Sequence, residues 1–341
     1  MKNRINWIDV GKGIGILLVV LGHSLRDSMM SSSTVCNAIY TMVYAIHMPF
    51  LMYLSGYMFA VKSDSYLQKG IKKYGLLKAN KLMKPYLVYA VIVYAGIRIV
   101  FQNETLGNIL TLAGYQKENF SQFVLGLLSG ENAYSFHLWY IYCLAVLSIL
   151  GFVIWKITDT NSMTMFREKI VWVFIIVVVL YTILVSRKIN VPRIISATTS
   201  MFPWYFMGCL RFTDRFSKKT NLCSGIVSIS VIVLYSFQLL PISVSVYRVI
   251  KYVLVTGAIF GMVVLSKAFS NSKMLSYLGT NSMIIYLFHQ PFIAAGIGII
   301  TYDYLKIPMC ISIVLTTIAS IVLPIIIARI LKVLRLWKIV F

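Results

Sequence analysis

The chain has 341 residues, of which 59% are hydrophobic and 12% are charged, and its formal net charge is +22 at pH 7. Soluble domains carry about 25% charged and 45–50% apolar residues, so this composition excludes a soluble domain and indicates an integral membrane protein. A strongly positive charge suggests nucleic-acid binding in a soluble domain, but here the cations lie between apolar runs, so we expect the lipid bilayer and no nucleic acid as a partner.

Apolar runs separated by charged gaps predict about ten transmembrane helices, because a spanning helix needs about 20 mostly apolar residues. The predicted spans are 8–25, 38–61, 85–101, 137–155, 170–186, 200–212, 224–240, 249–266, 282–300 and 308–328. The sixth is short. We expect one all-α transmembrane domain over 1–341, with a loop and a short amphipathic piece in the gap 102–136.

The gaps differ in charge from one side of the predicted bundle to the other. An even number of spans puts both termini on one side, and that side, counted with Lys12, holds 23 of the 32 Lys and Arg residues. Acidic residues are divided equally. The positive-inside rule therefore predicts that both termini are cytoplasmic. The five cysteines are scattered and lack CxxC spacing, which predicts neither disulfides nor a metal site.

The first span carries ionisable residues at both ends. A charge near the bilayer centre costs at least about 2.5–3.5 kcal/mol, so such a residue usually has a partner or a function. Lys12 and His23 are eleven positions apart, which puts them within about 20° around a helix and about 16 Å apart along it. One face would then present a cation to one membrane surface and an imidazole to the other. Alternatively, Lys12 extends to the headgroups and His23 is an interfacial residue.

The same span contains the run Gly11-Lys12-Gly13-Ile14-Gly15. A nucleotide-binding loop needs GxxxxGK[ST] spacing after a strand, and both are missing here. We expect these glycines to let a neighbouring helix approach closely instead.

The gap 62–84 holds seven lysines, three of which recur every third residue before Pro85. These three, Lys78, Lys81 and Lys84, would share a helical face over a short length. One interpretation is a juxtamembrane segment attracted to anionic lipid at about 1 kcal/mol per residue. The other is a phosphate-binding site at the mouth of a cavity.

All four histidines lie in or at the edge of predicted spans, namely His23, His47, His137 and His289. Proline follows two of them by two residues, at Pro49 and Pro291, and predicts a kinked or broken helix at each place. Each histidine alone could be a structural hydrogen-bonding group, but together they predict a polar cavity lined by broken helices. No two are spaced as i,i+3 or i,i+4, and no acid or cysteine stands in ligand register, so we expect no metal.

Five motifs together are specific: WIDVGKGIGILLVVLGHS, HMPFLMYLSGYMF, KANKLMKPY, FHLWYIY and LGTNSMIIYLFHQPF. Through them the chain resembles the acyltransferase-3 family of bacterial multi-pass membrane acyltransferases, in its fucose 4-O-acetyltransferase-like branch. That family typically has a basic residue, ten intervening residues and a histidine in its first helix, which Lys12 and His23 match. Family members often have arginine at the positions of Lys12, Lys81 and Lys84. Lysine keeps the charge but lacks the planar bidentate fork.

The resemblance implies transfer of an acyl group, usually acetyl, from cytoplasmic acetyl-CoA to a sugar hydroxyl. The acceptor would be a surface polysaccharide or its polyprenyl-linked precursor, and the enzyme would lie in the bacterial cytoplasmic membrane. Histidine suits the reaction, because a base must take the hydroxyl proton. The expected catalytic residues are His23, Lys12, His137 and His289. The expected donor-binding residues are Lys78, Lys81, Lys84 and His47.

Two other functions fit parts of the pattern. A transporter that flips or exports a lipid-linked glycan would also have about ten helices, kinked spans and a basic cytoplasmic face, but would not consume acyl-CoA. A non-catalytic membrane scaffold would not need ionisable residues within its spans.

Overall fold

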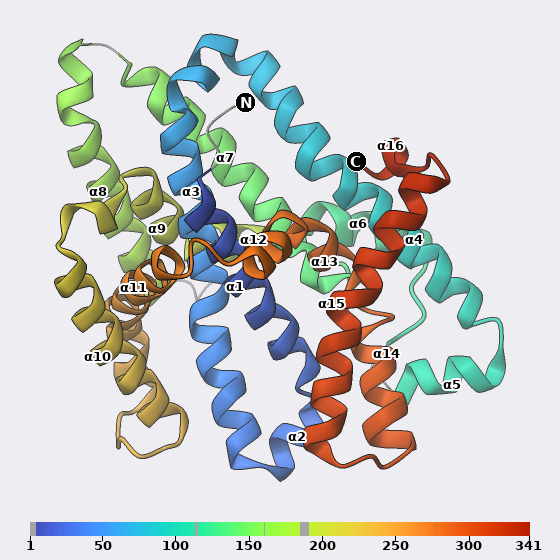
Figure 1. Ribbon diagram of the computed structural model, residues 1–341. Coiled ribbons are helices and arrows are strands. Elements are labelled where there is room, and N and C mark those ends of the chain that lie inside the picture. Colours follow the sequence, from blue (N-terminus) through green and yellow to red (C-terminus); the bar gives the residue numbers. More distant parts are fainter. Residues whose placement is uncertain (1–4, 113–114, 160, 185–190) are drawn as a thin grey trace.

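The structure is a computed structural model that describes residues 5–112, 115–159, 161–184 and 191–341. Every regular element in these ranges is a helix (Figure 1). In chain order they are α1 (Asn6–Ser24), α2 (Asp27–Ser32), α3 (Thr34–Lys78), η1 (Ala79–Met83), α4 (Lys84–Val100), α5 (Glu104–Leu112), α6 (Phe120–Ser129), η2 (Phe136–Leu138), α7 (Trp139–Ile157), α8 (Asn161–Leu184), α9 (Arg193–Cys209), η3 (Phe212–Arg215), α10 (Lys218–Ser236), α11 (Val244–Ala268), α12 (Lys273–Thr280), α13 (Ser282–Phe288), α14 (Ala294–Gly298), η4 (Ile299–Tyr304), α15 (Met309–Val333) and α16 (Trp337–Val340).

Six helical segments in the described part of the chain are long and apolar enough to cross a membrane. They are Asn6–Ser24, Thr34–Val100, Phe136–Ile157, Lys218–Ser236, Val244–Ala268 and Met309–Val333. The chain is therefore an all-helical, multi-pass membrane protein, as the sequence predicts. The predicted fifth and sixth spans correspond to α8 and α9, although residues 185–186 lie outside the described residues. The ninth corresponds to α13 and α14. The predicted gap 102–136 contains two short helices, α5 and α6.

The second and third predicted spans are connected by helical segments that change direction at Gly70. Helix α3 continues far beyond the predicted end of its span, and α4 follows it through the π-helical turn η1. The direction changes at Gly70, whose φ of 72° is the left-handed conformation that glycine adopts without steric cost. Figure 1 shows α3 running from the bottom of the view to the top, with α1 beside its lower half and α7 beside its upper half.

The two proline motifs behave differently. At Pro49 the expected break is absent, because α3 stays helical there and its only non-helical backbone angles are at Gly70. Helix α3 packs against both α1 and α9, and transmembrane helices tolerate proline because neighbouring helices and local adjustments satisfy the freed backbone groups. At Pro291 the predicted break is confirmed: α13 ends at Phe288 and helix resumes only at Ala294.

Glycines let helices approach closely at the run that the sequence indicates, and also at Gly56. A Cβ on Gly13 would overlap the backbone carbonyl of Leu275 in α12, and one on Gly279 of α12 would overlap that of Asp9 in α1. Helices α1 and α12 thus pack with their backbones in contact, as the glycine run predicts. Gly56 of α3 meets the backbone of α9 in the same way.

A hydrogen-bonded cluster around Asp214 in η3 joins four elements. Its carboxylate accepts from the Tyr57 hydroxyl of α3 at 2.7 Å, from Arg211 Nε at 3.0 Å and from Lys267 Nζ of α11 at 3.2 Å. The Lys267 ammonium also lies 5.2 Å from the ring centroid of Trp7 in α1. The cluster therefore joins the start of α1, the middle of α3 and the end of α11.

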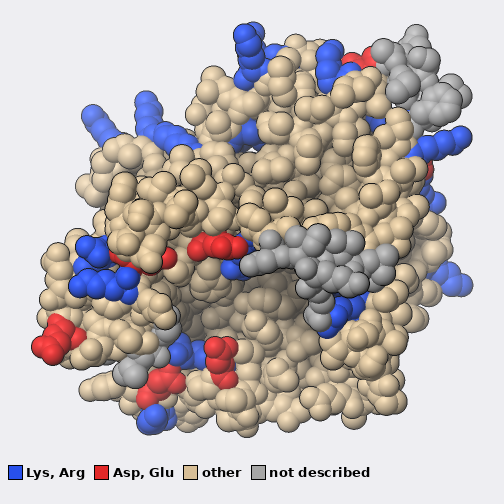
Figure 2. All heavy atoms as spheres, turned by 180° about the vertical axis from the view of Figure 1, so that it is seen from behind, with Lys and Arg blue, Asp and Glu red and all other residues tan. Residues whose placement is uncertain are grey.

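Charged side chains are unevenly distributed over the surface. Figure 2 shows Lys and Arg projecting along the upper part of the molecule, whereas most of the visible Asp and Glu lie in its middle and lower parts among other Lys and Arg. The lysine-rich segment 62–84 belongs to the end of the molecule where α3 turns back (Figure 1). This end is the one that the positive-inside rule assigns to the cytoplasm.

Candidate functional site

The structure brings the four histidines together, although they come from four different elements. His23 is near the end of α1, His47 is in α3, His137 is in η2 and His289 directly follows α13. The ring centroids of His23 and His289 are 5.1 Å apart, and those of His289 and His137 are 5.4 Å apart. Tyr44 lies between His23 and His47, with its ring centroid 5.9 Å from the His23 ring and 4.9 Å from the His47 ring.

These histidines surround a cavity of about 400 Å³, which we call the histidine chamber. His23, His47 and His137 line it, and His289 lies behind them with none of its surface exposed. The remaining walls come from α3, η2, α7, α9, α11 and α13, so the chamber exists only when both halves of the chain pack together. A cavity at the histidines was predicted and is present, but only one of the two expected helix breaks, that at Pro291, borders it.

Hydrogen bonds to backbone carbonyls fix which ring nitrogen carries the proton in three of the four. A carbonyl oxygen only accepts, so the nitrogen bonded to it must donate. His47 Nδ1 donates to Val43 O at 2.6 Å, His289 Nδ1 to Tyr286 O at 2.8 Å and His137 Nε2 to Leu287 O at 3.3 Å. In the neutral rings the other nitrogen is therefore a lone-pair acceptor. His289 Nε2 and His137 Nδ1 are buried and have no hydrogen-bond partner.

His23 differs from the other three. It is half-buried, and its Nδ1 lies 3.4 Å from the Tyr44 hydroxyl, which can either donate or accept. Its tautomer is therefore free to change during a reaction, whereas the carbonyl contacts hold the other three rings in one tautomer. Of the four, His23 is the ring best placed to exchange a proton with a molecule in the chamber.

The break between α13 and α14 shapes one side of the chamber. Tyr286 donates a hydrogen bond to the backbone carbonyl of His137, and Tyr89 of α4 donates one to the carbonyl of Gln290. Both hydroxyls thus bond carbonyls that flank the chamber, one in η2 and one in the broken segment. The break at Pro291 consequently positions His289 and attaches its segment to η2 and α4.

The predicted donor-binding lysines separate into two groups. Lys78 interacts electrostatically with Lys81, Lys62 and Lys12, so these ammonium groups form one cationic cluster that includes the first helix. Lys78 also lies 5.3 Å from the ring centroid of Tyr74.

Lys84 lies apart from this cluster, because its ammonium donates to the Lys338 backbone carbonyl of α16. The three regularly spaced lysines therefore do not converge on one point, since the π-helical turn between Lys78 and Lys84 alters the expected helical face. None of them lines the histidine chamber. His47, grouped with them on sequence grounds, lies in the chamber instead.

Sequence reasoning missed several residues of the chamber. Tyr44 and Tyr286 each precede a histidine by three positions, in Tyr44-x-x-His47 and Tyr286-x-x-His289, a spacing that places each tyrosine beside its histidine on one helical face. This repeated pattern could have revealed them. Arg193 and Lys251 also line the chamber, but nothing local in the sequence distinguishes them from other cations near helix ends.

The comparison with family models gives one match over nearly the whole chain. A model described as an acyltransferase domain, that of acyltransferase family 3, matches residues 5–329. The chain belongs to acyltransferase family 3. The matched region contains all four histidines, Lys12, the lysine cluster and every residue that lines the chamber, while α16 lies beyond it. Searches of curated proteins and of solved structures gave no significant match.

Membership of acyltransferase family 3 implies an acyl donor, and the described side chains present two regions suited to different parts of such a reaction. One is the cationic cluster around Lys78, and the other is the histidine chamber. Among the described residues, no group of three His, Cys, Asp or Glu side chains is arranged to hold a metal ion.

Proposed function

We propose that this acyltransferase is an O-acetyltransferase of the fucose 4-O-acetyltransferase-like branch, in a single transmembrane domain in the bacterial cytoplasmic membrane. It would transfer acetyl from cytoplasmic acetyl-CoA to a sugar hydroxyl of a surface polysaccharide or its lipid-linked precursor. The observation that carries the proposal is the convergence of all four histidines around one chamber, where His23 is the most exposed of the three that line it.

The chamber contains the groups that acyl transfer to a hydroxyl needs. The hydroxyl oxygen attacks the thioester carbonyl carbon while a base takes the hydroxyl proton. The carbon–sulfur bond then breaks, and the proton passes to the sulfur that leaves as the CoA thiol. We assign the base to His23, whose ring is both accessible and free to change tautomer.

His289 and His137 continue from His23 as a row of imidazoles and would position it or accept its proton in turn. Their unpartnered nitrogens, His289 Nε2 and His137 Nδ1, are lone-pair acceptors in a buried, low-dielectric setting. The Tyr44 hydroxyl beside His23 is a neutral donor that could stabilise the charge developing on the carbonyl oxygen.

The cationic cluster would hold the phosphates of the donor. Lys12 and Lys81 belong to it together with Lys78, and lysine binds phosphate as a point charge. Lys12 and His23 are both in α1, about 16 Å apart along its axis. The acetyl-bearing arm of CoA is long and flexible, so the head group could stay at the cluster while the thioester reaches the chamber.

The test uses the purified protein in liposomes with acetyl-CoA and extracted surface glycan, measuring CoA thiol release and glycan O-acetyl esters by mass spectrometry. We expect acetyl esters with the wild type and a loss of about 10²–10⁴-fold in rate for His23→Ala, the usual effect of removing a general base. Thr41→Ala is the matched control, because Thr41 lines the same chamber but cannot act as a base. Glycan movement without consumption of acetyl-CoA would instead identify a transporter, and near wild-type acetylation by His23→Ala would refute the assignment of the base.

A further inference from the structure

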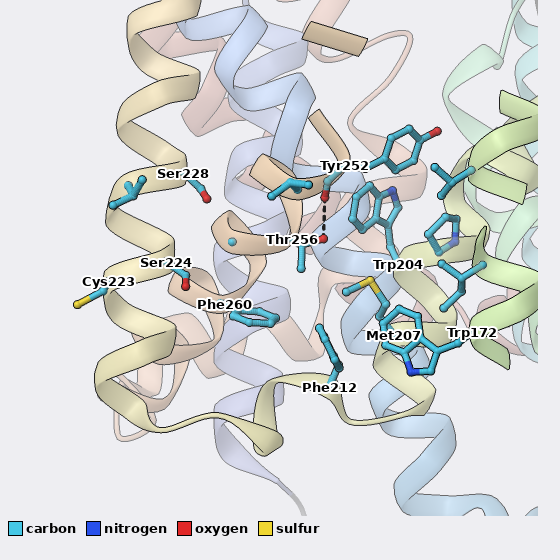
Figure 3. Close-up of a pocket in the computed structure, with 16 residues that line it drawn as sticks. Trp172, Trp204, Met207, Phe212, Cys223, Ser224, Ser228, Tyr252, Thr256 and Phe260 are labelled. Atoms are coloured by element: carbon cyan, nitrogen blue, oxygen red, sulfur yellow. Dashed lines mark hydrogen bonds between the residues drawn. The ribbon is translucent and has the colours of Figure 1, made fainter. Parts of the chain in front are cut away.

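The histidine chamber shares a wall with a second, larger cavity. This cavity is an apolar groove of about 700 Å³ between α8, α9, α10 and α11 (Figure 3). Trp204 and Tyr252 line both the groove and the chamber, and their rings stack with centroids 5.6 Å apart and planes 17° apart. The two spaces are therefore neighbours, separated by one aromatic pair.

The groove has the chemistry of a site for a hydrocarbon chain. Its lining contains no Lys, Arg, His, Asp or Glu, and its Thr256 hydroxyl already donates to the Tyr252 carbonyl at 2.7 Å (Figure 3). Val253 and Val227 at its edge are 73% and 62% exposed, so in a bilayer they face lipid. From Tyr252 to Phe260 along α11, the groove covers about 12 Å of helix.

The chamber side of the aromatic pair is cationic. Arg193 and Lys251 line the chamber, and no acidic residue does so among the described residues. The Lys251 ammonium lies 5.5 Å from the Tyr252 ring centroid, directly beside the shared wall. Arg193 interacts electrostatically with Tyr286, which places it on the side of the buried histidines.

The order of these features is the order of the parts of an amphiphile. An apolar groove open to lipid comes first, then the aromatic pair, then two cations, and finally the histidines. We propose that the acceptor is a lipid-linked sugar phosphate. Its isoprenoid chain lies in the groove, its phosphate lies near Arg193 and Lys251, and its sugar hydroxyl reaches His23. This inference rests on the proposed function and narrows its acceptor to the lipid-linked precursor.

A binding experiment tests the proposal without depending on catalysis. Undecaprenyl monophosphate is titrated against the purified full-length protein in detergent, and bound lipid is measured by native mass spectrometry. The variant Val253→Trp fills the groove edge, and Arg193→Gln with Lys251→Gln removes the cations. We expect each to weaken binding by at least tenfold. The matched controls on α11 are Val249→Trp and Arg248→Gln, which replace residues outside both linings, and we expect them to bind like the wild type.

Two comparison lipids distinguish the occupant. Uncharged undecaprenol should bind more weakly than the phosphate and be insensitive to loss of the cations. If phosphatidylglycerol competes equally and responds equally to Val253→Trp, the groove holds an ordinary membrane lipid and the proposal is wrong. Equal binding by all variants would also overturn it.

Acetylation, measured separately, keeps this inference distinct from the proposed function. Binding of undecaprenyl monophosphate with the expected variant pattern but no acetyl transfer would contradict the proposed function and leave the amphiphile site standing. Full-rate acetylation of a glycan lacking lipid, unchanged in Val253→Trp, would refute the lipid-linked acceptor and leave the acetyltransferase standing.

Discussion

At the residue scale, Lys78, Lys81 and Lys84 are evenly spaced in the sequence, but only Lys78 and Lys81 belong to the cationic cluster. Lys81 and Lys12 share the electrostatic environment of Lys78, whereas the Lys84 ammonium is occupied by the Lys338 carbonyl. The three-residue spacing predicted a shared face, but a π-helical turn and a contact from the distant C-terminal helix decide which lysines meet. Neither is encoded in the local pattern.

We expect Lys12→Gln and Lys81→Gln each to raise the KM for acetyl-CoA about tenfold, corresponding to loss of about 1.4 kcal/mol of binding free energy. Lys84→Gln should have a smaller effect, since its ammonium contacts α16 and lies outside the cluster. Lys69→Gln, in the same segment but outside the cluster, is the control. Steady-state kinetics at fixed acceptor measures all four. Small, equal losses that modest salt abolishes would mean that the whole segment attracts the donor nonspecifically.

Asp214 offers a prediction about pH. Burial disfavours its ionised form, but hydrogen bonds from Tyr57, Lys267 and Arg211 outweigh that cost and hold the pKa of its carboxyl below the ordinary value of 3.8. Because the folded-state pKa is the lower one, its contribution to stability is fully present above about pH 3.8 and is lost as pH falls through the folded-state value.

The variant Asp214→Asn should lower the thermal unfolding midpoint near neutral pH, because about 1–3 kcal/mol of charge-assisted hydrogen bonding is lost. The difference from wild type should stay constant from pH 7 down to about pH 5 and shrink below about pH 3.8. Thermal unfolding in detergent at several pH values measures it. A difference that does not change with pH would show that Asp214 acts through packing alone.

At the element scale, the sequence predicted most of the helices. It did not predict every place where a helix continues, turns or breaks. Long apolar runs fix spans such as α1 and α15 because the bilayer leaves few alternatives to a helix. The helix that continues through Pro49 could not be read from the local sequence, because proline favours a break there and neighbouring helices decide whether one forms. The sequence predicted that the histidines share a cavity. It did not predict which rings lie next to each other, because that depends on packing between helices far apart in the chain.

Gly70 gives a test of the turn in α3. Its φ of 72° disfavours any residue with a side chain, and nothing lies within 4 Å of where a Cβ would stand, so backbone strain alone sets the cost. We expect Gly70→Ala to destabilise the protein by about 1–3 kcal/mol, seen as a lower unfolding midpoint. Gly75→Ala is the control, because its position is equally open but lies within regular helix. Equal stability of the two variants would mean that the turn is not a fixed feature.

At the scale of the whole molecule, the two chemical regions lie along one helix. Lys12 and His23 are separated by about 16 Å along α1, which is roughly half of a ~30 Å hydrocarbon core. A single side chain cannot bridge that distance. The donor head group and the acceptor hydroxyl would then meet the protein from opposite sides of the membrane, with the acyl end of the donor reaching the chamber between them.

Sealed vesicles of opposite orientation test this arrangement directly. We expect acetyl-CoA to support acetylation only when it is added to the lysine-rich face, and a membrane-impermeant acceptor to react only from the opposite face. The physical reason is that the cationic cluster lies about 16 Å from His23 along α1 and that none of its lysines lines the chamber. Acetyl esters are measured by mass spectrometry after each combination of sides, with detergent-opened vesicles as the control for total activity. Full-rate acetylation of an acceptor supplied only on the cytoplasmic side would rule out transfer across the membrane. It would confine both substrates to one face and leave the enzyme class unchanged.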